Sequence, residues 1–159
     1  MFKALALFLI SIKVLFEPVP APEIAAQIVP DFDSRVLPNY SAPIWERSRG
    51  HRGIDIELAR GEQIAAPFAG SVSFVGKVFQ RRVITIRSGN LLASFEPVCS
   101  DLRVGQVVVA GEAIATHCAG DEDYREHCEG CVHFSVRTER GYLNPLLFYN
   151  RIRPSSFVS

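Results

Sequence analysis

From residue 51 onward, the sequence consists of short alternating segments separated by glycine-containing turns, and this pattern restricts the fold more than any other feature. The segment Gly-Ile-Asp-Ile-Glu-Leu at 53–58 has an apolar residue at every second position, and runs rich in valine and isoleucine follow at 71–78 and 81–87. Such alternation is typical of strands that bury one face. We therefore expect a compact all-β domain over residues 50–150, an antiparallel sheet or sandwich, with helix confined mostly to the N-terminal segment.

The first 16 residues have the character of a targeting segment. Lys3 precedes an apolar run at 4–12, which is shorter than the roughly 20 residues that a membrane span needs. The run fits the apolar region of a secretory signal, although no clean cleavage site follows it. We expect residues 1–16 to be a signal peptide or an N-terminal membrane anchor, residues 17–49 a proline-rich linker, and residues 151–159 a C-terminal tail. The domain is then expected to be exported and extracellular, or held at a membrane by this segment.

The overall composition limits the partners. The chain has 159 residues, 48% hydrophobic and 21% charged, which suits one globular domain with a real core. Its formal net charge is zero. No basic excess is available to neutralise phosphates, which argues against electrostatic binding of nucleic acid.

Two segments carry candidate metal ligands. His-Arg-Gly-Ile-Asp at 51–55 places His51 just before an expected strand and Asp55 inside it, while Gly53 leaves room for the backbone to turn. Cys-Val-His at 131–133 lies on another expected strand, where His133 and Cys131 share the face opposite the apolar residues. Two histidines and a carboxylate are suitable zinc ligands and leave a fourth position open. The spacing alone is also consistent with a surface histidine beside a salt-bridged aspartate.

The order of these motifs resembles that of the lysostaphin/LytM-type zinc metallopeptidases, a family with a duplicated hybrid motif. The resemblance covers about residues 50–149: the His-x-Gly-x-Asp motif, the glycine-rich β core and a closing Cys-Val-His-Phe in place of the usual His-x-His-Phe. It implies that His51, Asp55 and His133 bind zinc. It also implies an exported peptidase that hydrolyses peptide cross-links of bacterial peptidoglycan, with zinc activating water and polarising the scissile carbonyl.

Two positions depart from the pattern of this family. Its Tyr-x-His-Leu segment is here Phe95-Glu96-Pro97-Val98, so Pro97 replaces one catalytic histidine, and Cys131 replaces the other. Proline neither donates nor accepts a proton, and each positioned acid–base group supplies roughly 100- to 10,000-fold in rate. Glu96 is a candidate substitute for the general base, and an exposed strand glutamate is an equally good interpretation. Cys131 stands where the family has its second catalytic histidine, and we do not expect it to act as a catalyst.

The four cysteines allow several arrangements. In an oxidising compartment, Cys99, Cys118, Cys128 and Cys131 form two disulfides in one of three pairings, and the sequence alone does not choose among them. Cys131 is a fourth zinc ligand, half of a disulfide or a free thiol. We favour a disulfide with Cys118, because a bond to Cys128 would close a very small ring; Cys99 and Cys128 would then form the second pair.

The remaining histidines are expected to lie outside the site. His117 and His127 are most simply exposed loop residues. A separate zinc knuckle formed by His127, Cys128 and Cys131 would need reducing conditions.

Two functions of different classes follow from these motifs. The first is a zinc-dependent peptidoglycan endopeptidase, weakly active, supported by the intact ligand set. The second is a degenerate, non-catalytic zinc-binding module on the same fold that binds the wall or regulates another protein, supported by Pro97 and Cys131. In either case the N-terminal segment offers a membrane tether.

Overall fold

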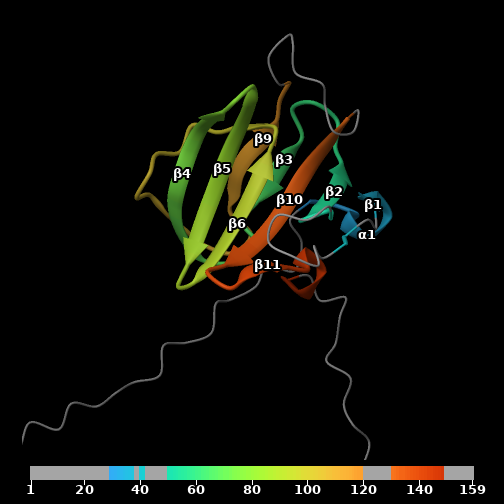
Figure 1. Ribbon diagram of the computed structural model, residues 1–159. Coiled ribbons are helices and arrows are strands. Elements are labelled where there is room, and N and C mark those ends of the chain that lie inside the picture. Colours follow the sequence, from blue (N-terminus) through green and yellow to red (C-terminus); the bar gives the residue numbers. More distant parts are fainter. Residues whose placement is uncertain (1–28, 38–39, 42–49, 120–129, 149–159) are drawn as a thin grey trace, which may run out of the picture.

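The computed structural model describes residues 29–37, 40–41, 50–119 and 130–148, and these form two antiparallel β-sheets (Figure 1). The large sheet has the order β1 (Val36–Leu37), β2 (Ile54–Glu57), β10 (Cys131–Thr138), β6 (Leu91–Glu96), β5 (Arg81–Ser88), β4 (Gly70–Val78) and β8 (Val107–Val108), with β11 (Gly141–Leu143) paired to β10. The small sheet has the order β3 (Gln63–Ala65), β9 (Ala113–His117) and β7 (Val98–Cys99).

The core lies between the two sheets, because one face of the large sheet is apolar. In Figure 1 the strands of the small sheet lie behind those of the large one. Phe95 of β6 and Phe134 of β10 are fully buried and stack with ring centroids 4.5 Å apart. Ile64 of β3 and Ile114 of β9 belong to the same buried cluster. The opposite face of the large sheet is left to form a site.

Two similar turns lead into two strands of the small sheet. In the turn before β3, the N–H of Glu62 donates to the carbonyl of Ala59, and the N–H of Ala59 donates to the Glu62 carboxylate. Val109 and Glu112 make the same pair of contacts before β9. Each turn contains a glycine with positive φ (86° at residue 61 and 82° at residue 111), a conformation that favours this residue. The repeat explains the similar sequences at 61–64 and 111–114.

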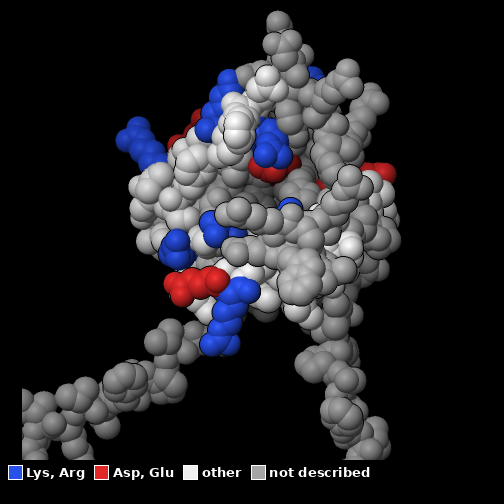
Figure 2. All heavy atoms as spheres, in the orientation of Figure 1, with Lys and Arg blue, Asp and Glu red and all other residues white. Residues whose placement is uncertain are grey.

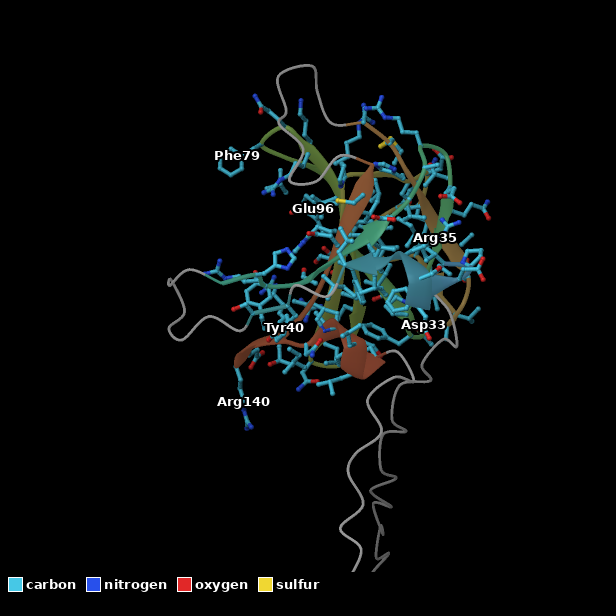
Figure 3. The ribbon with its side chains drawn as sticks, turned by 90° about the vertical axis from the view of Figure 1, so that its right-hand side faces the viewer. Asp33, Arg35, Tyr40, Phe79, Glu96 and Arg140 are labelled. Atoms are coloured by element: carbon cyan, nitrogen blue, oxygen red, sulfur yellow. A yellow bond between two sulfur atoms is a disulfide. The ribbon has the colours of Figure 1, made fainter. Side chains whose placement is uncertain are left out.

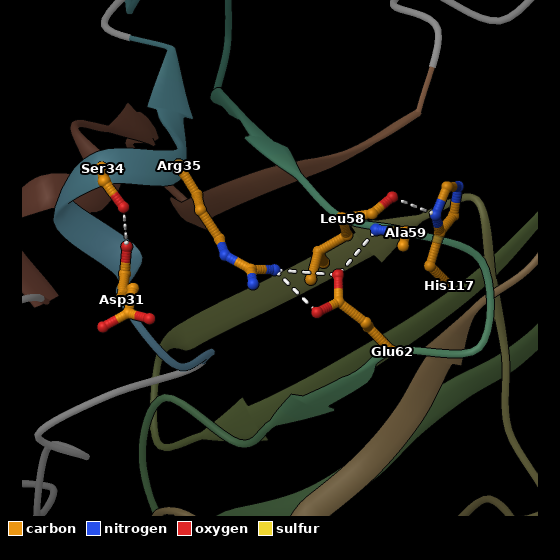
Figure 4. Close-up of polar contacts among 7 residues, drawn as sticks. All are labelled: Asp31, Ser34, Arg35, Leu58, Ala59, Glu62 and His117. Carbon is orange, nitrogen blue, oxygen red and sulfur yellow. Dashed lines mark hydrogen bonds and ion pairs between the residues drawn. The ribbon is translucent and has the colours of Figure 1, made fainter.

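Residues 29–37 pack onto the domain, although they fall within the range expected to be linker. The short helix α1 (Phe32–Arg35) and strand β1 bury Val29, Phe32 and Val36, and β1 pairs with β2. Nη1 of Arg35 donates to both carboxylate oxygens of Glu62, at 2.8 and 2.9 Å (Figure 4). This segment belongs to the folded unit because its apolar side chains fill the core beside β2.

The all-β expectation is confirmed for the described residues. Their helices are α1 and the 3₁₀ helix η1 (Pro145–Phe148), each of four residues. No helix among the described residues has the length and apolar character needed to cross a membrane. The expected leader at 1–16 and tail at 151–159 lie outside the described residues.

One disulfide joins two strands of the small sheet, and it corrects the expected pairing. Cys99 of β7 bonds to Cys118, which directly follows β9, with Cα atoms 5.6 Å apart. The predicted Cys118–Cys131 and Cys99–Cys128 pairs are therefore both wrong. The reason is topological: β7 and β9 are neighbours, whereas Cys131 begins β10 in the other sheet. Cys131 is itself disulfide-bonded, and Cys128 lies outside the described residues.

Candidate metal centre and groove

The pairing of three strands brings three candidate site residues into one row. On the antiparallel ladder, His133 of β10 lies directly opposite Asp55 of β2 on one side and Glu96 of β6 on the other. Directly opposed residues share a face of the sheet, with Cβ atoms about 4.5–5.5 Å apart. Their neighbours Ile54, Phe95 and Phe134 point into the core. The row therefore lies on the face that the core leaves open.

His51 completes a compact cluster with Asp55 and His133. The Asp55 carboxylate lies between the two imidazoles: Oδ1 is 2.8 Å from His133 Nδ1, and Oδ2 is 3.4 Å from His51 Nε2. One ligand atom from each of the three residues lies within 4.8 Å of the others. Zinc bonds of about 2.0–2.2 Å in a tetrahedron would hold neighbouring ligand atoms about 3.3–3.6 Å apart. The observed spacings span this value, so the donor set fits a zinc ion.

Gly53 is required for the two halves of the cluster to meet. A Cβ atom built on Gly53 would lie 2.5 Å from His133 Nε2 and would also clash with the carbonyl oxygen of Phe134. Real Cβ contacts are not this short. The loop from His51 to Asp55 therefore passes directly over the His133 ring, which covers Nε2 and leaves Nδ1 facing Asp55.

Glu96 faces the same groove as the cluster. The groove has a volume of about 550 Å³, and His51, His133, Glu96 and Pro97 are among the residues that line it. Figure 3 shows Glu96 on the side of the sheet that carries this groove. Its Oε1 accepts from Arg81 of β5 at 2.9 Å. Arg81 was missed by the sequence analysis, because only the pairing of β5 with β6 brings it beside Glu96.

Cys131 has no free thiol. Cys131 is buried, lines the groove and is disulfide-bonded. Of the three roles left open for it, the disulfide is the one observed, so its sulfur is not a thiolate ligand. The zinc knuckle with His127 and Cys128 involves residues outside the described ranges.

His117 is buried, which corrects the expectation of an exposed loop residue. It ends β9 with 1% of its surface exposed. Its Nδ1 lies 2.7 Å from the carbonyl oxygen of Leu58, and because a carbonyl only accepts, Nδ1 carries the proton (Figure 4). His117 is not among the residues that line the groove. It therefore helps to join the small sheet to the end of β2, away from the cluster.

Basic residues extend the groove beyond the cluster. Arg52 and Arg137 also line it, and Arg52 lies over the ring of Tyr142 at 5.8 Å from its centroid. Figure 2 shows this face of the molecule, where blue basic side chains lie beside a hollow that also carries red acidic atoms. These residues were not predicted from the sequence. The alternation that placed His133 on the open face also places Arg137 there.

A family model matches the part of the chain that carries this site, and a sequence relative matches most of the chain. The family model for peptidase family M23 matches residues 49–145. An uncharacterised protein of Mycobacterium tuberculosis (strain H37Rv) is 31% identical over 111 residues, which cover 67% of this chain and 43% of that protein. The chain thus spans less than half the length of this relative.

Solved structures share the fold. Lysostaphin superimposes with a TM-score of 0.63 and 17% identity, covering 82% of this chain and 57% of that one. A zinc-containing peptidase from Vibrio cholerae gives a TM-score of 0.58 and 20% identity, covering 76% of this chain and 38% of that one.

Proposed function

The chain belongs to peptidase family M23, and from this premise we propose that it is a zinc-dependent endopeptidase acting on peptide cross-links of bacterial peptidoglycan. The observation that carries the proposal is the convergence of His51, Asp55 and His133 within 4.8 Å on the open face of the sheet. Two imidazoles and a carboxylate are the donor set of a catalytic zinc site with an open position. The zinc named for the Vibrio cholerae structure is consistent with this choice of metal.

Each residue of the site has a distinct part in this proposal. A zinc ion, when bound, supplies Lewis-acid chemistry that activates water and polarises a carbonyl. His133 Nδ1, His51 Nε2 and the Asp55 carboxylate between them would hold the ion. Glu96, the carboxylate directly opposite His133, would accept a proton from water. Arg81 holds the Glu96 carboxylate in place through the 2.9 Å ion pair.

A second candidate function is a non-catalytic wall-binding or regulatory module. The specific observation that favours it is the disulfide at Cys131, which leaves no proton-handling group at that position. Pro97 is equally unable to transfer a proton, and Glu96 is engaged by Arg81. We therefore expect hydrolysis to be weak even where zinc binds.

We also propose that the protein acts outside the cytoplasm. The Cys99–Cys118 disulfide supports this, because such bonds persist mainly in oxidising compartments. Export through residues 1–16, or retention there as a membrane tether, fits the apolar run in the sequence.

Zinc content and wall hydrolysis, measured on the same preparation, separate the two functions. The purified protein is assayed for bound zinc by mass spectrometry and for release of soluble fragments from peptidoglycan, with and without a chelator. An endopeptidase shows zinc near one equivalent and slow release that the chelator stops. A binding module shows zinc and sedimentation with peptidoglycan but no release. Absence of bound zinc at micromolar metal would overturn both.

A further inference from the structure

The open face of the sheet continues past the metal cluster as further rows of side chains. Along β10, His133, Ser135 and Arg137 point to this face at every second position. Ser135 lies opposite Ser94 of β6, whose hydroxyl is 2.9 Å from that of Thr85. The groove floor therefore changes from metal ligands to hydroxyl groups and then to a cation.

The cation at the end of this series is available to a ligand. Arg137 is exposed, and none of the ion pairs or hydrogen bonds within the described part of the chain occupies its guanidinium. By contrast, Arg81 at the other end of the groove is paired with Glu96. The groove therefore has a positive charge at its Arg137 end that a negatively charged ligand group could pair with.

An aromatic residue and a second cation lie beside Arg137. Tyr142 of β11 is its direct cross-strand partner, and Arg52 lies over the Tyr142 ring at 5.8 Å from the centroid. All three residues line the groove. The guanidinium of an arginine is a planar fork of donors that matches the two oxygens of a carboxylate. The Tyr142 ring, which lies beside Arg52 and Arg137, limits the positions that their guanidinium groups can take.

We propose that Arg137, with Arg52 and Tyr142 beside it, forms a subsite that binds a carboxylate of the substrate peptide. This rests on the proposed function in that the groove accepts wall peptides. Arg137 is four residues beyond His133 on β10, which corresponds to about 13 Å along a strand. An extended peptide covers about 3.3–3.6 Å per residue. The carboxylate thus lies within about four residues of the scissile bond, and peptides with a free carboxylate there are preferred over their amides.

The test measures binding of a matched pair of peptides. The probe is a fluorescently labelled peptidoglycan stem pentapeptide, prepared with the α-carboxylate of its glutamate either free or amidated. Fluorescence anisotropy with the zinc-loaded protein gives a Kd for each form. We expect the free acid to bind about fivefold more tightly, the upper range for a solvent-exposed ion pair. Arg137→Gln should remove this preference, and Arg137→Lys should restore part of it.

Arg140 provides the matched control. It is an exposed arginine three residues further along the chain, it is not among the groove residues, and Figure 3 shows it projecting into solvent at the end of the molecule remote from Glu96. Arg140→Gln should leave the preference unchanged. An equal loss in Arg140→Gln would show that net charge, and not the subsite, is responsible, and would overturn the inference.

The outcome also distinguishes this inference from the proposed function. Equal binding of the acid and the amide by the native protein overturns the subsite, while zinc-dependent release of wall fragments would leave the endopeptidase standing. Failure of either peptide to bind overturns the subsite as well. The release assay then decides whether the endopeptidase falls with it. Where the native protein hydrolyses the peptides, Arg137→Gln should raise KM for the acid and leave kcat nearly unchanged.

Discussion

Glu96 lies directly opposite His133 on the neighbouring antiparallel strand, and both side chains face the groove. This relationship places a carboxylate beside the proposed metal site in a chain whose Pro97 and Cys131 have no proton to transfer. It also defines the first two tests, because one residue of the pair is expected to bind metal and the other is not.

Replacing His133 with alanine should abolish zinc binding. Its Nδ1 is 2.8 Å from the Asp55 carboxylate, and three ligands are the minimum protein set for a catalytic zinc. Zinc measured by mass spectrometry after dialysis should fall from about one equivalent to near zero. Ser135→Ala, two residues along the same face of β10, should retain the metal. Full zinc content in His133→Ala would remove this histidine from the ligand set.

Glu96→Gln should abolish hydrolysis and leave zinc in place. Glutamine keeps the shape of the side chain but does not accept the proton of water, and loss of a general base costs about 100- to 10,000-fold in rate. The measurement is release of soluble wall fragments at matched zinc content. A variant that hydrolyses at the native rate would exclude Glu96 as the base.

Gly53→Ala should destabilise the domain and weaken metal binding together. The added Cβ would meet His133 Nε2 at 2.5 Å, and overpacking of this kind costs about 1–3 kcal/mol. The midpoint of urea unfolding and the zinc content are measured on the same variant. Gly76→Ala is the control, because the nearest atom to its Cβ is the ring of Phe74 at 3.3 Å, the end of a movable side chain. Equal effects in both variants would argue against a special role for Gly53.

Removing the Cys99–Cys118 bond should lower the free energy of unfolding by about 3 kcal/mol, as expected for a loop of this length. The double substitution Cys99→Ser, Cys118→Ser is compared with the native protein by urea denaturation. Because this bond joins β7 and β9, the large sheet and its zinc site should survive where the protein still folds. An unchanged unfolding midpoint would show that the bond contributes little.

Acid should weaken the attachment of residues 29–37. The Arg35 guanidinium and, to a lesser extent, the N–H of Ala59 lower the pKa of Glu62 below its usual 4.5. Because the pKa is depressed in the folded state, this stabilisation is complete above pH 4.5 and is lost as the pH falls through the lowered value.

The corresponding measurement is thermal unfolding from about pH 6 down to about pH 3. Glu62→Gln should flatten the decrease in Tm below pH 4.5. Glu112→Gln is the control, since its carboxylate accepts the equivalent backbone hydrogen bond in the second turn. If Glu112→Gln flattened the decrease as much as Glu62→Gln, the arginine would not be the cause.

The parts of the structure that were predictable from sequence depend on local alternation. Because side chains alternate between the two faces of a strand, the sequence predicted that His133 and Phe134 lie on different faces of the sheet. The same alternation identified Asp55 as a polar residue within an apolar strand. The ordered motifs then indicated which strands carry the site. The Glu96–Arg81 contact was not predictable, because it requires the pairing of β5 with β6.

Two expectations failed for related physical reasons. The disulfide partner of Cys118 depends on β7 and β9 being neighbours in the small sheet, which no local pattern indicates. His117 is buried on a strand where both Ile114 and Ala115 are also buried, so alternation no longer distinguishes an inner face from an outer one. In a strand that is buried on both faces, the sequence does not indicate which side chains point to which face.

Strand β10 serves the core with one face and the groove with the other, and this limits the ways in which the protein can diverge. Inserting or deleting a single residue just before His133 would shift the rest of β10 by one position against its neighbours, turning His133 inward and Phe134 outward. Substitutions at alternate positions carry no such penalty. Across descendants of this chain, the groove should therefore diversify by replacement at 135 and 137, while the length of the strand stays fixed.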